Sequence, residues 1–172
     1  MTNVEINKQA KLSEHFTLGE LCKTSAKTAD GNIPSHVHIE NLKRLCGWLE
    51  QLRRRYNEQY VILRKEEGGK RNEDSLEAEE PILINSGYRS PEVNKAIGGV
   101  VGSNHLTGCA VDIHVYGLEQ LIRYAAILLD ISDLNNEDFD ELLLERSPRG
   151  TYWLHFAVRP QNNRRKVRLI QT

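Results

Sequence analysis

Two short segments with alternating side chains most constrain the fold of this chain. In residues 109–115, CAVDIHV, Asp112 and His114 fall at alternate positions between larger apolar side chains. In residues 151–158, TYWLHFAV, His155 falls opposite the larger apolar side chains in the same way. Because successive side chains of a strand point to opposite faces, both segments are predicted to be half-buried β-strands. The side chains of Asp112, His114 and His155 are then predicted to point away from the core, on the other face of one sheet.

The remaining periodicity predicts several helices and further strands. Thr17 is followed by Glu20 at the third helical position, which predicts a capped lead-in helix. Apolar residues recur at helical spacing over about 35–57, 91–97 and 118–129. Short β-type runs lie at 82–84, 141–145 and 167–170. We therefore predict an α+β fold, with helices packed on one face of a small, mostly antiparallel sheet.

The length of 172 residues fits a single domain with one core. We expect this core to span about residues 12–158. Residues 65–80, KEEGGKRNEDSLEAEE, are charged and contain almost no apolar side chains, which predicts a mobile surface insertion. Residues 159–172 form a basic C-terminal tail.

Composition argues against several classes of function. Lys and Arg total 23 against 24 Asp and Glu, so no strong field of one sign favours nucleic acid or a membrane surface. The three cysteines form no CxxC pair and indicate buried free thiols. The first sixteen residues lack the apolar segment of a signal peptide, and no apolar run approaches the roughly 20 residues that span a bilayer. We expect a soluble monomer that is cytoplasmic as synthesised.

A third polar residue suggests a metal site. His105 lies in GGVVGSNHLTG, residues 98–108, whose glycines indicate tight loops just before the first alternating strand. Two imidazoles and one carboxylate leave a fourth position open, as in catalytic zinc sites, where zinc brings the pKa of water to about 7. We predict one zinc ion on His105, Asp112 and His155. Taken singly, each histidine is more often a surface or hydrogen-bonded residue, and we assign that role to His15, His36 and His38.

Three segments resemble a known family in order and spacing: SGYRS at 86–90, SNHLTGCAVDI at 103–113 and WLHF at 153–156. They are similar to the zinc D-alanyl-D-alanine peptidases, a family with a Hedgehog/D-Ala-D-Ala peptidase-like fold that includes phage endolysins cutting the L-alanyl-D-glutamate bond. The resemblance covers about residues 12–158 and implies the same three zinc ligands. It also implies that Arg89 anchors the carboxylate or polar end of the substrate and that Ser103 hydrogen-bonds it. Without the motif, Arg89 would be assigned to a salt bridge and Ser103 to a turn cap.

One position departs from the family pattern. Well-studied members carry a catalytic Glu three residues before the last histidine ligand, where Tyr152 stands here. Glu145 is our candidate for the general base, because a branch of the family carries a similar Glu on the preceding strand. Alternatively, Glu145 pairs at the surface with Arg146 or Arg149. His114 is a second candidate for a catalytic role, or else an exposed strand histidine.

The resemblance implies a zinc metallopeptidase that cleaves a peptide bond next to a D-amino acid in bacterial peptidoglycan. We favour an endolysin-like endopeptidase over a carboxypeptidase, because a wall enzyme without an export signal suits a phage or prophage lysis gene and acts on the wall after release. The replacement at Tyr152 leaves a second hypothesis open, a non-catalytic, metal-stabilised module that binds wall fragments. A third hypothesis is a soluble α+β domain whose histidines bind no metal.

Overall fold

A five-stranded sheet carries most of the polar residues discussed above. The computed structural model describes residues 7–62 and 79–171. Its strands lie in the order β1-β2-β4-β3-β5, and all neighbours are antiparallel except β3 and β5. Their bounds are Ile84–Ser86 (β1), Ala110–His114 (β2), Glu141–Arg146 (β3), Tyr152–Ala157 (β4) and Lys166–Gln171 (β5). The prediction of a single α+β domain with a mostly antiparallel sheet is thereby confirmed.

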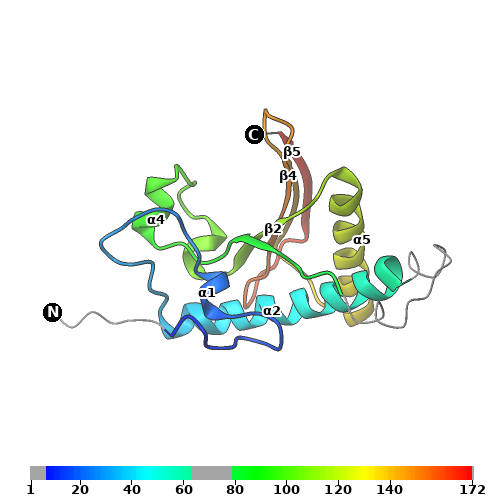
Figure 1. The fold of residues 1–172 in the computed structure, drawn as a ribbon, viewed down its shortest axis with the longest axis horizontal. Helices are drawn as coiled ribbons and strands as arrows, with labels where there is room; N and C mark the ends of the chain where they lie inside the picture. The colour runs from blue at the N-terminus through cyan, green and yellow to red at the C-terminus, as the bar shows by residue number, and fades with distance from the viewer. Residues whose placement is uncertain (1–6, 63–78, 172) are drawn as a thin grey trace.

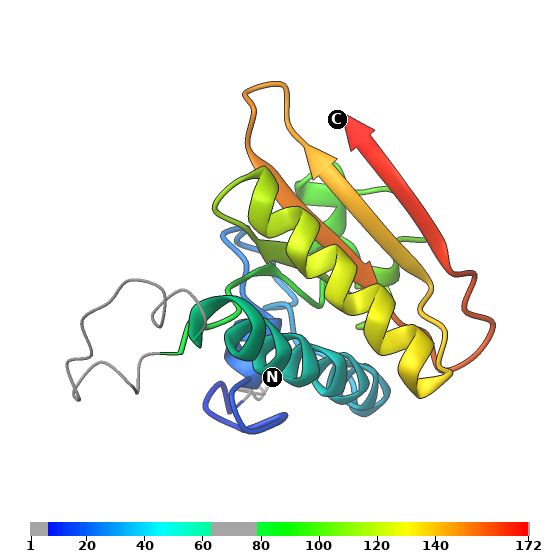
Figure 2. The ribbon, with the colours of Figure 1, turned by 90° about the vertical axis from the view of Figure 1, so that its right-hand side faces the viewer.

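Two long helices cover one face of this sheet (Figures 1 and 2). Helix α2, His36–Tyr56, begins at the N-cap Ser35, and helix α5, Leu118–Asn135, packs against it and against β3 and β4. Apolar side chains at helical spacing on α2 are buried in the core, where the Trp48 ring contacts the Phe156 ring of β4. The helices thus fill one face of the sheet, and its other face carries the polar side chains.

Two elements differ in extent from the sequence prediction. The strand expected at 82–84 is assigned at Ile84–Ser86, because its pairing with β2 shifts register between Ile84 and Ser86. Leu83 still contributes to the pairing with β2, since its carbonyl oxygen accepts a hydrogen bond from His114 N at 2.8 Å. Helix α5 runs to Asn135 instead of ending near 129, because Ile131 is buried in the core and the left-handed Asn136 ends the helix only later.

Other predicted segments have mixed outcomes. Helix α2 continues into a π-helical turn, η1, Asn57–Ile62. The insertion expected at 65–80 lies outside the described residues except for 79 and 80. The strand predicted at 167–170, within the basic tail, is confirmed, because residues 166–171 form β5. In the part of the chain that the structure describes, no helix is long and apolar enough to cross a membrane, and the three cysteines are buried and free.

The N-terminal lead-in packs on the segment after β1. Helix α1, Leu18–Leu21, begins with a complete capping box formed by Thr17 and Glu20. Tyr88 N donates to the carbonyl oxygen of Leu21 at 2.6 Å. Gly87 permits this approach, because a Cβ built there would lie 2.2 Å from that same oxygen. The SGYRS segment is therefore held from behind by α1.

Candidate metal site

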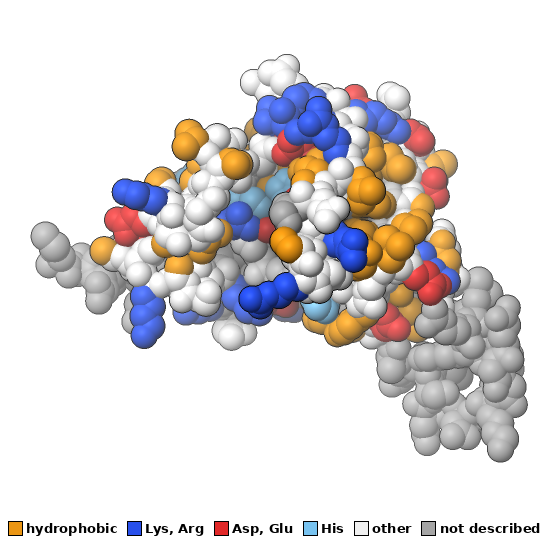
Figure 3. Space-filling view, turned by 90° about the horizontal axis from the view of Figure 1, so that it is seen from above, with side chains coloured by type: hydrophobic (Ala, Val, Ile, Leu, Met, Phe, Trp, Pro, Cys, Tyr) orange, Lys and Arg blue, Asp and Glu red, His pale blue; other side chains and the backbone are white. Residues whose placement is uncertain are grey.

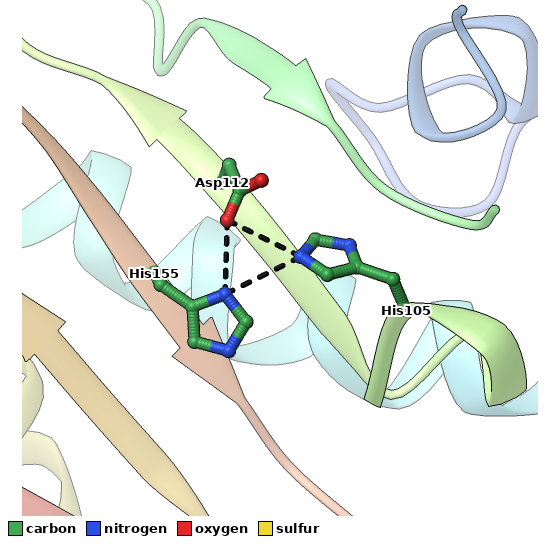
Figure 4. A group of neighbouring side chains, drawn as sticks. All are labelled: His105, Asp112 and His155. Carbon is green, nitrogen blue, oxygen red and sulfur yellow. Dashed lines mark hydrogen bonds and ion pairs between the residues drawn. The ribbon is translucent and has the colours of Figure 1, made fainter. Parts of the chain in front are cut away.

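Three side chains from separate elements converge on the open face of the sheet (Figure 4). Asp112 Oδ1 lies 2.9 Å from His155 Nδ1 and 3.2 Å from His105 Nε2. The two imidazole nitrogens are 3.3 Å apart. His105 and His155 are buried, and the Asp112 side chain is 13% exposed. The sequence-predicted ligand set is therefore brought together as one group.

Local structure explains this convergence. Asp112 on β2 lies directly opposite His155 on β4 in the antiparallel register, so both side chains point to the same face. His105 comes from the 3₁₀ turn η3, Asn104–Thr107. This turn ends at the left-handed Gly108, where a Cβ would lie 2.7 Å from the carbonyl oxygen of His38. A glycine is required there both for its backbone conformation and for close packing on α2.

The donor set fits a zinc ion. Zinc commonly takes imidazole nitrogen and carboxylate oxygen, and tetrahedral ligands at about 2.0–2.1 Å from it lie roughly 3.3 Å from one another. The three separations between His105, Asp112 and His155 are 2.9, 3.2 and 3.3 Å. These atoms could therefore share one tetrahedral ion after small adjustments.

Each imidazole has a second partner for its other nitrogen. His105 Nδ1 lies 2.6 Å from the carbonyl oxygen of Gly87. His155 Nε2 lies 3.6 Å from Glu141 Oε2. Both contacts leave the nitrogen that faces Asp112 as the one available to a metal ion, as is usual for metal-binding histidines.

The electrostatics of the group reflect its burial and mutual contacts. Burial lowers the pKa of His155, but the carboxylates of Asp112 and Glu141 outweigh it and raise this pKa to about 9. Burial acts in the opposite direction on Asp112, yet His105 and His155 hold the pKa of this carboxyl well below its usual range. The metal-free group thus keeps a proton on His155 at neutral pH, and a metal ion would have to displace that proton.

The group lies in an open cleft of about 570 Å³. In Figure 1 the segment around α4, Pro91–Ala96, rises on one side of this cleft, and β4 and β5 rise on the other. Seen from above, histidine and basic side chains lie in the hollow between the two halves (Figure 3). Arg89, Ser103, Glu145 and Trp153 all line the cleft together with the three candidate ligands.

Arg89 and Ser103, the predicted substrate-binding residues, also have partners within the protein. The Arg89 guanidinium binds Asp112 Oδ2 through Nη2 and donates from Nε to Ser86 Oγ at 2.7 Å. Ser103 Oγ accepts from His105 N at 3.3 Å and caps η3. Both residues therefore help to hold the ligand set, whatever they contribute to substrate binding.

Both catalytic candidates, Glu145 and His114, lie on the face of the sheet that carries the candidate ligands. Glu145 lies opposite Trp153 in the register of β3 and β4, on the face that carries His155. Tyr152 lies on the other face, below the guanidinium of Arg146. Burial raises the pKa of the Glu145 carboxyl, and among the described residues this carboxylate has no hydrogen bond or ion pair. His114 lies on the face of Asp112, edge-on to the Tyr116 ring, and outside the residues that line the cleft.

Sequence reasoning missed a charged network at one end of the cleft. Glu141 accepts from Lys166 Nζ at 2.8 Å and from Asn104 Nδ2 at 3.0 Å, and Arg164 Nη2 lies 3.0 Å from its Oε1. The neighbouring imidazole of His155 and the hydrogen bond from Lys166 hold the pKa of Glu141 well below the usual range. Asp140, which is fully buried, binds Asn104 and Arg164 in turn. Glu141 lies on the same face of β3 as Glu145, but no motif in the sequence marks its partners.

Comparison with known proteins agrees with a peptidase site. The sequence model of a family described as Peptidase M15 matches residues 69–134. This segment contains Arg89, Ser103, His105 and Asp112, and it ends before His155. No curated protein matches the chain. The match covers less than half of the chain and indicates a peptidase, and the His-Asp-His group could hold a metal ion.

Proposed function

We propose that the chain is a zinc metallopeptidase that holds one zinc ion on His105, Asp112 and His155. The observation that carries the proposal is the convergence of two imidazole nitrogens and one carboxylate oxygen at 2.9–3.3 Å from one another. Their position in an open cleft, within reach of a substrate, favours a catalytic site over a purely structural one. When bound, zinc would act as a Lewis acid that polarises a carbonyl oxygen, and it would lower the pKa of water so that hydroxide is available near neutral pH.

Glu145 is the proposed general base. Its carboxylate lies on the ligand face of the sheet, has no ion-pair partner among the described residues and has a raised pKa because of burial. These properties suit a group that takes a proton from the attacking water and passes it to the nitrogen of the leaving amine. Glu141 suits this role less well, because its oxygens are already bound by Lys166, Arg164 and Asn104. His114 remains a weaker candidate for a supporting role.

Substrate binding is assigned to Arg89 and Ser103. A guanidinium has five N–H donors, so Arg89 can hold Asp112 and still bind a substrate carboxylate. Ser103 lies at the rim of the cleft, where its hydroxyl proton can be donated to a substrate carbonyl. By resemblance, the proposed substrate is the D-amino-acid-containing stem peptide of bacterial peptidoglycan. We favour endopeptidase over carboxypeptidase activity, in a monomeric enzyme that reaches the wall after release from the cell.

Digestion of purified peptidoglycan tests this function. The zinc-loaded protein should release new amino groups, and mass spectrometry of the fragments should locate the cleaved bond. His155→Ala should abolish both zinc binding and release, because it removes one of three ligands. Undiminished release by His155→Ala, or wild-type protein that contains no zinc, would contradict the proposal.

A non-catalytic binding module is the second candidate. It is favoured by one observation, that Tyr152 replaces the glutamate expected from the family and points to the face opposite His155. In that case the zinc-loaded chain would bind soluble wall fragments without releasing amino groups, and Glu145→Gln would leave binding unchanged. Fragment binding and amine release measured on the same sample separate the two candidates.

A further inference from the structure

The two nitrogens of His155 face different carboxylates. Nδ1 lies 2.9 Å from Asp112 Oδ1, on the side of the proposed metal, and Nε2 lies 3.6 Å from Glu141 Oε2 (Figure 4 shows the first contact). Glu141 and His155 come from the neighbouring strands β3 and β4 and share one face of the sheet. Glu141 therefore approaches the imidazole from behind, and its carboxylate does not join the three donor atoms.

This arrangement determines where the imidazole must carry its proton. A neutral imidazole has a single N–H, so binding a metal through Nδ1 requires the proton to be on Nε2. A carboxylate facing Nε2 favours that tautomer and fixes the rotation of the ring. His105 has a matching arrangement, because its Nδ1 faces the carbonyl oxygen of Gly87 at 2.6 Å and leaves Nε2 for the metal. Both candidate histidine ligands are thus supported from behind.

Glu141 is itself held in place by two cationic side chains and one amide. Its Oε1 binds Lys166 Nζ at 2.8 Å and lies 3.0 Å from Arg164 Nη2, whereas its Oε2 accepts from Asn104 Nδ2 at 3.0 Å. Asn104 is fixed in turn by Asp140 at 2.8 Å and by Arg159 Nε at 2.9 Å. The Glu141 side chain is only 14% exposed. A carboxylate anchored at both oxygens can hold a neighbouring ring precisely in position.

We infer that Glu141 is a positioning residue for the metal site, which orients His155 through Nε2 and does not itself take part in proton transfer to the substrate. The inference rests on the proposed zinc site. The two glutamates on this face of β3 then have separate roles. Glu141 supports zinc binding, and Glu145 acts in turnover. The parallel strand β5 thereby gains a function, since it delivers Lys166 to Glu141.

Zinc affinity, measured by competition with a chromophoric chelator, tests this role without reference to activity. Glu141→Gln should weaken zinc binding 10- to 100-fold, the usual cost of losing a group that supports a metal-bound histidine. Glu145→Gln is the matched control, because it removes the same charge from the same face of β3 and should change zinc affinity by less than threefold. Equal losses in both variants would show a general charge effect and overturn the inference.

A second variant and a spectroscopic measurement guard against simple misfolding. Lys166→Met removes the contact to Glu141 Oε1 but leaves Oε2 facing His155, so zinc affinity should fall by less than fivefold. In zinc-loaded wild-type protein, nitrogen NMR of the His155 ring should show a slowly exchanging proton on Nε2. A proton on Nδ1 instead would overturn the inference, even if Glu141→Gln fails to fold. A wild-type chain that binds no zinc would overturn the metal site as well, whereas normal zinc binding by Glu141→Gln would overturn only this role.

Discussion

The two ends of the cleft along β3 differ in how completely their carboxylates are paired. At one end, Glu141 is bound by Lys166, Asn104 and the ring of His155. At the other end, four residues further along the same strand, Glu145 faces Trp153 and has no hydrogen bond or ion pair among the described residues. Hydrogen bonds lower the pKa of Glu141, and burial raises that of Glu145.

This difference shows how one strand can provide two chemically distinct glutamates. A carboxylate that is saturated with donors stays ionised and fixed, which suits structural support. A half-buried carboxylate without a hydrogen bond or ion pair accepts a proton more readily than a solvated one, which suits acid–base work. The surroundings, and not the residue type, therefore separate the two proposed roles, and each of the following predictions tests that separation.

The largest expected effect is on turnover at the Glu145 end. Glu145→Gln should lower kcat by about 10²- to 10⁴-fold, the usual contribution of a general base, because the amide cannot accept the proton. KM and zinc content should stay near wild type. Amine release from purified wall fragments, with zinc measured on the same sample, checks this. Wild-type kcat in the variant would remove Glu145 from the mechanism.

A smaller loss of activity is expected at the Glu141 end, and added zinc should reverse it. Glu141→Gln at limiting zinc should lose activity in proportion to its 10- to 100-fold weaker zinc binding. Excess zinc should restore most of that activity, because the proposed base is untouched. The same titration should give no recovery in Glu145→Gln. Recovery in both variants, or in neither, would contradict the assignment of separate roles.

The network behind Glu141 should also contribute to stability. Asn104→Ala leaves Asp140 and Glu141 without a shared donor in a buried setting, which should lower the free energy of unfolding by about 1–3 kcal/mol. Asn135→Ala, which removes an exposed contact to Gln51, should change it by less than about 0.5 kcal/mol. Urea unfolding of the metal-free proteins measures both. Similar values for the two variants would mean that the network contributes little.

The smallest expected effect is a change in pH dependence. The pKa of His155 is raised from 6.5 to about 9 in the folded, metal-free protein. A raised pKa stabilises the folded state fully below about pH 6.5, and this contribution is lost as pH rises toward 9. Glu141→Gln should flatten the decline, since it removes one of the two carboxylates that hold the proton. Urea unfolding with a chelator present measures the free energy of unfolding at several pH values. An equal slope against pH in Glu141→Gln and wild type would contradict this account.

Local patterns predicted much of the fold and the side chains that meet in the candidate metal site. Strict alternation placed Asp112 and His155 on the open face, and the antiparallel register then set them opposite each other. The capping signal at Thr17 correctly marked the beginning of α1, and the helical spacing from residue 35 marked the beginning of α2. These features depend on residues close together in sequence, where the side-chain period of a strand or helix decides the outcome.

The charged network was not predictable in the same way. Lys166 reaches Glu141 only because β5 pairs with β3 in parallel, and no turn or spacing near residue 166 indicates that pairing. Likewise, Asp140 and Asn104 lie 36 positions apart and meet only through tertiary structure. The shift of β1 toward Ser86 follows from an irregular register with β2, which the apolar run at 82–84 does not encode.

The close packing of α1 behind the SGYRS segment has a consequence for His105, one of the three proposed zinc ligands. The peptide group that joins Gly87 and Tyr88 donates its N–H to the carbonyl of Leu21 and offers its own carbonyl to His105 Nδ1, each at 2.6 Å. Hydrogen bonds in such a chain polarise one another, so each strengthens the next. Through this chain, the packing of α1 should increase the electron density on the His105 ring and so strengthen His105 as a donor to the proposed zinc ion.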